Sequence, residues 1–147
     1  MGENIELVRE LNGVKYLFNH KGNSPSQTAS MLEAFNQKVI LITSGYDDNY
    51  SVDTLGNVLV EKVKHLILFG GATAMIEMSL MRKLTGKNQG IDIRITHCTT
   101  LKQAVDCAFL SSKPDDIVIL SAAGSCVDIY SSMEEMCDAY RQYAAEL

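Results

Sequence analysis

The chain has 147 residues, of which 46% are hydrophobic and 21% are charged. This length is usual for one domain, and the composition excludes a disordered chain. The net charge is −5, and no cluster of lysines or arginines stands out. We therefore expect neither a nucleic acid nor a membrane as a partner. No apolar stretch approaches the ~20 residues that a membrane span needs.

The four cysteines are spaced too far apart for a CxxC pair, and the N-terminus has no basic region followed by an apolar run. Disulfides and secretion signals belong to exported proteins, so we expect reduced thiols in a soluble, cytoplasmic protein.

In chain order, the sequence first predicts a β-hairpin and then a helix. Residues 5–8 and 14–18 are strand-like, and Asn12-Gly13 between them is typical of a tight hairpin turn. Ser24 is a good N-cap, Pro25 suits the first helical position, and Gln27 is placed to close a capping box. The helix should run to about residue 35.

Four apolar runs follow, at residues 39–42, 66–69, 91–95 and 117–120. Three are continuous, as expected of strands that are covered on both faces. The run at 91–95 alternates and predicts an edge strand.

Helical stretches at residues 53–62, 72–84 and 101–110 separate these runs, and a last helix should run from Ser131 or Ser132 to about residue 145. The alternation predicts an α/β fold: a three-layer, Rossmann-like domain with a mainly parallel sheet and an N-terminal β-hairpin, over residues 1–147.

Small or polar residues follow each predicted parallel strand, and ligands bind beyond the carboxyl ends of such strands. The alternative is that short loops are simply rich in these residues. Gly70-Gly71 precedes a helix, a weak signal for a phosphate site, but the chain has no GxxxxGK[ST] loop. His97 and Cys98 are neighbours on a strand and should face opposite ways. We predict no metal site and no complete catalytic centre.

Several segments, in this order, resemble the C-terminal domain of the Mur ligases, and within them the D-glutamate-adding ligases. They are FNHKGNSP at 18–25, MLEAF at 31–35, SGYDDN at 44–49, LSAAGSCVD at 120–128 and MEEMCDAY at 133–140. The resemblance covers almost the whole chain.

The resemblance implies one domain of a bacterial, ATP-dependent amide ligase of peptidoglycan precursor synthesis. The full-length enzyme would use ATP and Mg²⁺, whereas we expect neither bound to the isolated domain, which should be inactive alone. Its partners would be the ligase's N-terminal and central domains and small-molecule substrates.

The resemblance also implies site residues. Lys21 matches a lysine that faces the nucleotide phosphates, and Asn19 stands where the family has a ribose-binding aspartate. The positions that match the amino-acid substrate site are Asn23, Asp48, Ser125, Cys126 and Met133.

Two alternatives remain beside a D-glutamate-adding ligase. Asp48 stands where the family has a lysine for the D-glutamate carboxylate, and this change turns attraction into repulsion. The first alternative is therefore a divergent relative that has another substrate or has lost catalysis. The other alternative is a small-ligand-binding α/β module that performs no ATP chemistry.

Overall fold

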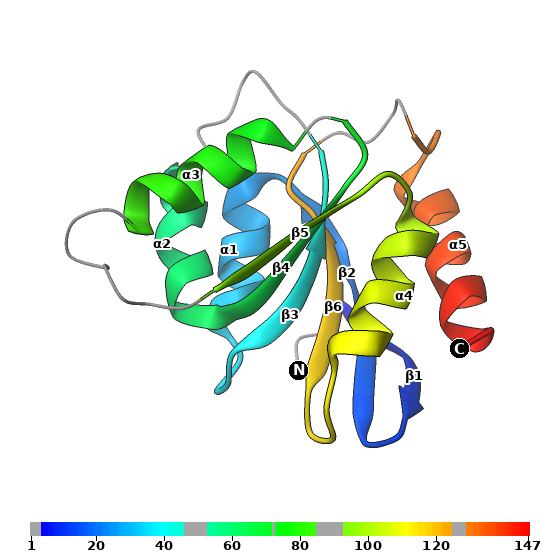
Figure 1. The fold of residues 1–147 in the computed structure, drawn as a ribbon. Helices are drawn as coiled ribbons and strands as arrows, with labels where there is room; N and C mark the ends of the chain where they lie inside the picture. Colours follow the sequence, from blue (N-terminus) through cyan, green and yellow to red (C-terminus); the bar gives the residue numbers. More distant parts are fainter. Residues whose placement is uncertain (1–3, 46–52, 72, 85–92, 125–128) are drawn as a thin grey trace.

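A computed structural model of the chain describes residues 4–45, 53–71, 73–84, 93–124 and 129–147. Strands and helices alternate through most of it (Figure 1). The elements are β1 (Ile5–Leu11), β2 (Val14–Asn23), α1 (Pro25–Glu33), β3 (Val39–Thr43), α2 (Asp53–Lys62), β4 (Val63–Phe69), α3 (Ala74–Leu84), β5 (Arg94–Cys98), α4 (Leu101–Ser111), β6 (Ile117–Ala122) and α5 (Met133–Ala145).

The six strands form one sheet in the order β1-β2-β6-β3-β4-β5. Among the described strands, only the β1–β2 pair is antiparallel, because a hairpin joins the two strands; the other pairs are parallel. The predicted α/β class is confirmed. β5 (Arg94–Cys98) lies at the edge, as its alternating sequence predicted; residues 91 and 92 of the predicted run lie outside the described residues.

The hairpin turn has the geometry that its sequence predicted. Asn12 and Gly13 have φ angles of 55° and 80°, both in the left-handed region. Two such residues in succession make the type I′ turn, whose twist matches that of the flanking strands. Asparagine and glycine adopt this conformation at lower cost than other residues do.

Helices cover both faces of the sheet, so the protein has three layers (Figure 1). The first hydrophobic cluster lies between the sheet and α1, α2 and α3, and the second lies between the sheet and α4 and α5. Along β3, Leu41 packs in the first cluster, whereas Ile40 and Ile42 pack in the second. This explains the continuous apolar runs: each face of these strands has a helical layer to contact.

The helix starts follow the predicted capping residues with one correction. The Ser24 hydroxyl accepts from the Gln27 amide at 3.2 Å, as expected of an N-cap. The Gln27 side chain, however, accepts from the amide of Asn23 at 3.4 Å instead of that of Ser24, so the predicted box is not closed. A closed box occurs at α4, between Thr100 and Gln103.

The last helix begins after Ser132, whose hydroxyl accepts from the Glu135 amide at 3.1 Å. It ends at Ala145, as predicted. None of the helices in the described ranges is both long and apolar enough to cross a membrane.

Candidate functional site

The carboxyl ends of the parallel strands lie together at the upper edge of the sheet in Figure 1, where α1 and α5 also begin. Polar groups join neighbouring strand ends there. The Thr43 hydroxyl donates to the carbonyl of Ser121 at 2.6 Å, and the Ala123 amide donates to the carbonyl of Ser44 at 2.8 Å. The Ser44 hydroxyl donates in turn to the carbonyl of Phe69. The ends of β6, β3 and β4 are therefore held in fixed relative positions.

The end of β2 departs from its partner strand and presents Lys21. Pairing with β6 is interrupted between Phe18 and Asn23. Within this interruption, Asn19 is buried, its Nδ2 donates to Ser121 Oγ at 3.1 Å, and its Oδ1 accepts from the Lys21 amide at 3.1 Å. The Lys21 side chain is exposed. Asn19 thus supports the backbone that carries an exposed ammonium group.

Gly22 completes this support by close approach to β6. A Cβ atom at this position would lie 2.3 Å from Ser121 Oγ and 3.1 Å from the Ala122 nitrogen. No side chain fits in that space, so residues 19–23 rest directly on the end of β6. The exposed Asn23 follows at the end of this segment.

The loops after β3 and β6 start in backbone contact. Gly45 has a φ of +112°, and a Cβ atom there would lie 2.6 Å from the carbonyl oxygen of Gly124. Only glycine tolerates both the dihedral angle and the close approach. The two loops that follow carry Asp48, Ser125 and Cys126, and these three residues lie outside the described residues.

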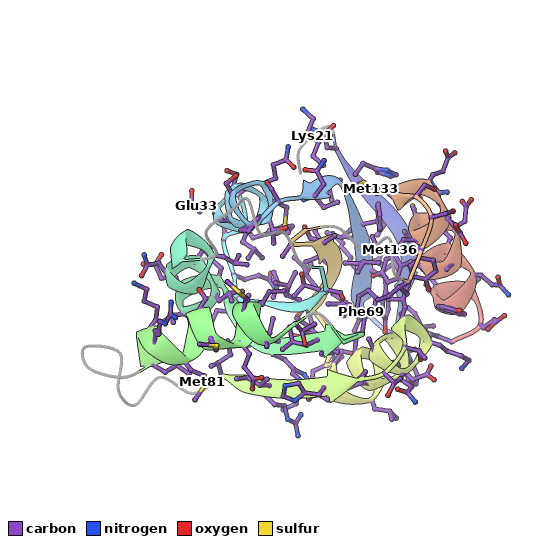
Figure 2. The ribbon with its side chains drawn as sticks, turned by 90° about the horizontal axis from the view of Figure 1, so that it is seen from above. Lys21, Glu33, Phe69, Met81, Met133 and Met136 are labelled. Atoms are coloured by element: carbon purple, nitrogen blue, oxygen red, sulfur yellow. The ribbon has the colours of Figure 1, made fainter. Side chains whose placement is uncertain are left out.

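Met133 is the other predicted site residue that the structure places. It is the first residue of α5, half-buried, and packs against the second hydrophobic cluster. Figure 2 looks down on this edge and shows Lys21 and Met133 on different elements around it. The structure therefore brings Asn19, Lys21, Asn23 and Met133 to the same edge of the sheet.

The Gly70-Gly71 segment leads from β4 toward α3. Gly70 turns the chain with a φ of +82°, and α3 begins shortly after it. Glu77, in the first turn of α3, already complements the positive end of the helix and pairs with His97 at 2.8 Å. Cys98 packs instead in the second hydrophobic cluster, which confirms that the two neighbours face opposite ways.

The sequence analysis did not identify one cluster of metal-ligating atoms, because its members come from β1, β2 and α5. The ligand atoms of Glu6, His20 and Cys137 lie within 4.8 Å of one another. Arg141, however, donates to both Glu6 oxygens, at 2.8 and 2.6 Å. Together with the hydrogen bond from His20, it lowers the pKa of Glu6 to about 2, while burial raises the pKa of the Cys137 thiol to about 11. A cation would have to displace Arg141, so we interpret the cluster as an ion-pair network.

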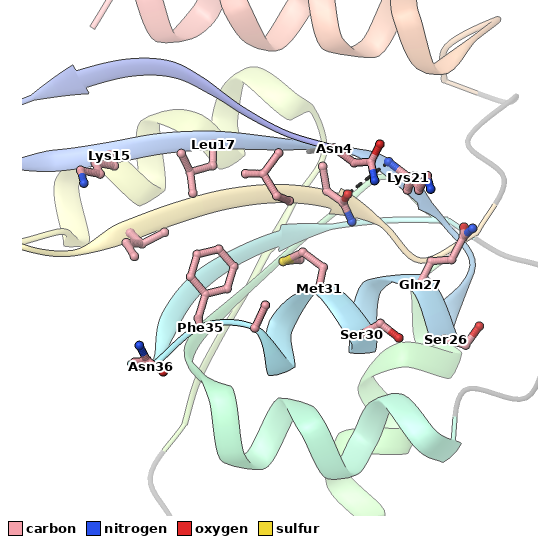
Figure 3. Close-up of a pocket in the computed structure, with 14 residues that line it drawn as sticks. Asn4, Lys15, Leu17, Lys21, Ser26, Gln27, Ser30, Met31, Phe35 and Asn36 are labelled. Carbon is pink, nitrogen blue, oxygen red and sulfur yellow. Dashed lines mark hydrogen bonds between the residues drawn. The ribbon is translucent and has the colours of Figure 1, made fainter. Parts of the chain in front are cut away.

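A groove of about 520 Å³ runs between β2 and α1, and Lys21 lies at one end of it (Figure 3). No sequence pattern predicted this groove, because its lining residues come from separate elements that the fold brings together. Its lining consists of Asn4, Ile5, Lys15, Leu17, Asn19, Lys21, Ser26, Gln27, Ser30, Met31, Ala34, Phe35, Asn36 and Ile117.

Comparison with known sequences gives one family and a consistent set of relatives. The family described as "Mur ligase, glutamate ligase domain" matches residues 5–124. The UDP-N-acetylmuramoylalanine–D-glutamate ligase of Acetivibrio thermocellus is 41% identical over 138 residues, which cover 94% of this chain and 30% of the relative. The same ligase of Ruminiclostridium cellulolyticum is 36% identical over 143 residues, which cover 97% of this chain and 31% of the relative. The chain thus spans about a third of the length of these relatives.

Solved structures share the fold at low sequence identity. A domain from Haemophilus ducreyi 35000HP has a TM-score of 0.60 and 11% identity, covering 97% of this chain and 94% of the solved chain. A murein peptide ligase from Psychrobacter arcticus 273-4 also has a TM-score of 0.60 and 11% identity, covering 92% of this chain and 29% of that one. At this identity the likeness concerns the fold alone.

Proposed function

Because the chain belongs to the Mur ligase family, as its glutamate ligase domain, we propose that it positions the incoming amino acid in an ATP-dependent amide ligase of peptidoglycan precursor synthesis. Residues 1–147 act as one domain beside the N-terminal and central domains of a longer, cytoplasmic bacterial enzyme. The A. thermocellus ligase, of which this chain spans 30%, supports that arrangement.

The observation that carries the proposal is the way Lys21 is held. Its side chain is exposed at the carboxyl edge, while its backbone amide is fixed by Asn19. Neither a hydrogen bond nor an ion pair occupies its ammonium group among the described residues. An ammonium group is a compact point charge suited to phosphate oxygens. Lys21 therefore fits the role of contacting the nucleotide phosphates.

Asn19 can contact a ribose through the hydrogen-bonding groups that its contacts within the protein leave unused. One amide hydrogen is given to Ser121 and one lone pair accepts from the Lys21 amide. A carboxamide carries a second amide hydrogen and a second lone pair, and Asn19 lines the groove. We assign it two tasks: it fixes the position of Lys21, and it offers the remaining donor to a ribose hydroxyl. ATP, with Mg²⁺, supplies the free energy for amide formation in the full-length enzyme.

The amino-acid substrate is proposed to bind between the exposed Asn23 and Met133. Asp48, Ser125 and Cys126 would approach it from the two loops that begin at Gly45 and Gly124, whose backbones touch. Together these residue types offer hydrogen-bonding groups and an apolar thioether. D-glutamate or a related amino acid is the substrate that the relatives suggest.

Asp48 favours a second candidate, a ligase for a neutral or cationic amino acid. A carboxylate at this position repels a substrate carboxylate, whereas it attracts an ammonium group. The same domain would then act in the same type of reaction with another amino acid. Loss of catalysis, or a role as a non-catalytic ligand-binding module, is the remaining possibility and is an outcome of the experiment below.

A chimera tests the proposal directly. The matching segment of the A. thermocellus ligase is replaced by this chain, and ATP-dependent amide formation is measured with D-glutamate, D-glutamine and D-lysine. We expect activity with one of these amino acids. Lys21→Ala should lower it by about a hundredfold, an effect typical of removing one preorganised charge contact to the transition state.

Lys38→Ala is the matched control, since Lys38 is exposed and lies outside the groove. This variant should leave the rate unchanged. D-glutamate activity supports the leading candidate, and activity only with D-glutamine or D-lysine supports the second. A folded chimera that forms no amide with any of the three would contradict both.

A further inference from the structure

The groove between β2 and α1 has an apolar floor that the ligase reaction leaves without a role. Met31 and Phe35, 8% and 9% exposed, form this floor above the fully buried Leu17, and all three are held by the core behind them. In Figure 3 their side chains point into the space between the strand and the helix. On the neighbouring strand, Leu7 pairs with Leu17 and is 46% exposed. An apolar surface on rigid elements is typical of a ligand site.

The ends of the groove are positively charged in a protein whose net charge is −5. Lys15 and Lys21 are both exposed, and both line it. They lie six positions apart on β2, which is up to about 20 Å along a strand. No carboxylate occurs among the described lining residues; Glu10, opposite Lys15 on β1, is not one of them. The charge pattern is therefore two cations separated by an apolar floor.

We propose that this groove binds an elongated aromatic dianion, with its ring system on Met31 and Phe35 and one anionic group at each lysine. Aromatic rings gain both from burial on such a floor and from contact with the Met31 sulfur. The polar wall consists of hydroxyl and amide side chains from α1, namely those of Ser26, Gln27 and Ser30. This inference goes beyond the proposed ligase function; because Lys21 and Asn19 are shared with the proposed nucleotide contacts, the dianion and a nucleotide would compete.

The test is an NMR titration of the 147-residue chain with biphenyl-4,4′-dicarboxylate, in the absence of nucleotide. The H. ducreyi structure, in which a chain of this fold is nearly the whole molecule, supports studying the domain alone. We expect saturable shifts confined to the amides of β2 and α1 that line the groove. Biphenyl-4-carboxylate should bind several-fold more weakly, and the uncharged 4,4′-biphenyldimethanol about tenfold or more.

Two variants separate specific binding from general affinity for aromatic compounds. Lys15→Glu should weaken binding of the dianion by about tenfold or more. Lys38→Glu, an equal charge change outside the groove, should leave the affinity unchanged. Ser30→Phe places a ring in the groove from the exposed face of α1 and should abolish binding without involving a lysine. Shifts outside the groove, equal binding of the uncharged compound, or full binding by Lys15→Glu would each overturn the proposal.

Discussion

Thr28 and Ser121 lie 93 positions apart in the chain, and their hydroxyl oxygens are 2.8 Å apart beneath the candidate site. Thr28 also donates to the carbonyl of Ala122 at 2.7 Å, and Ser121 accepts from Asn19. Both hydroxyl-bearing residues are fully buried. This contact joins α1 to β6 and, through Asn19, reaches the backbone of Lys21. The position of the exposed lysine thus depends on a buried hydrogen-bond network.

Thr28→Val should destabilise the protein by about 1–3 kcal/mol, because it leaves the Ala122 carbonyl without its side-chain donor in a buried setting. Valine has nearly the same shape, so the loss reports the hydroxyl group. Urea unfolding monitored by circular dichroism measures it. Ser30→Ala, on the exposed face of the same helix, should change stability by less than about 0.5 kcal/mol. An equal effect of the two substitutions would contradict the role given to the network.

Gly45→Ala should destabilise the protein far more than Gly71→Ala does. At Gly45 the new methyl group meets the Gly124 carbonyl at 2.6 Å and the φ is +112°, whereas at Gly71 nothing lies within 4 Å. We expect about 1–3 kcal/mol at Gly45 from overpacking and strain, and a small change at Gly71. Thermal unfolding of the two variants gives the comparison, and similar melting temperatures would refute the proposed backbone contact.

Much of this fold could be predicted because the relevant signals are local. The Asn12-Gly13 turn, the Ser24 cap and the continuous run at residues 39–42 each specify their own structure through backbone preference or burial. The exact partner of a side chain is not local. Gln27 bonds to Asn23 instead of closing the box on Ser24, because the amide nearest its carboxamide oxygen is set by the path of the incoming strand.

The candidate site could be predicted only in part, for the same reason. Lys21 and Met133 were found through resemblance, and the fold places both at one edge. The support of Lys21 by Asn19 and Ser121 joins residues about a hundred positions apart, and no spacing in the sequence indicates it. The groove was missed because Leu17 and Phe35 look like ordinary core residues in a sequence.

Removal of Arg141 should change the acid sensitivity of the protein in a defined pH range. Hydrogen bonds from Arg141 and His20 lower the pKa of Glu6 from 4.5 to about 2. A carboxyl group with a lowered pKa in the folded state contributes stability above pH 4.5, and this contribution is lost as the pH falls toward 2. Arg141→Gln should therefore show a smaller loss of stability between pH 4.5 and 2 than the parent protein, as measured by urea unfolding at a series of pH values.

Lys102→Gln serves as the comparison for Arg141→Gln. Lys102 pairs with Asp106 at 3.1 Å within α4, and both side chains are about half exposed. Such exposed pairs contribute little, so the pH profile of this variant should follow that of the parent. If both variants flatten the profile equally, net charge and not the Glu6 contact controls the acid sensitivity.

His65 should produce a separate loss of stability at higher pH. Burial, helped by the nearby positive charges of Arg94 and Lys64, lowers its pKa from 6.5 to about 4. The unfolded chain then binds a proton that the folded protein does not, so stability falls as the pH drops from 6.5 to 4, with a slope of at most about 1.4 kcal/mol per pH unit. His65→Gln retains a side chain that reaches Thr96, the hydrogen-bond partner of His65 at 2.8 Å, but cannot titrate. Its stability should be flatter across pH 6.5 to 4, while its behaviour between pH 4.5 and 2 stays that of the parent. An unchanged slope in the upper range would show that the fold does not lower the pKa of His65.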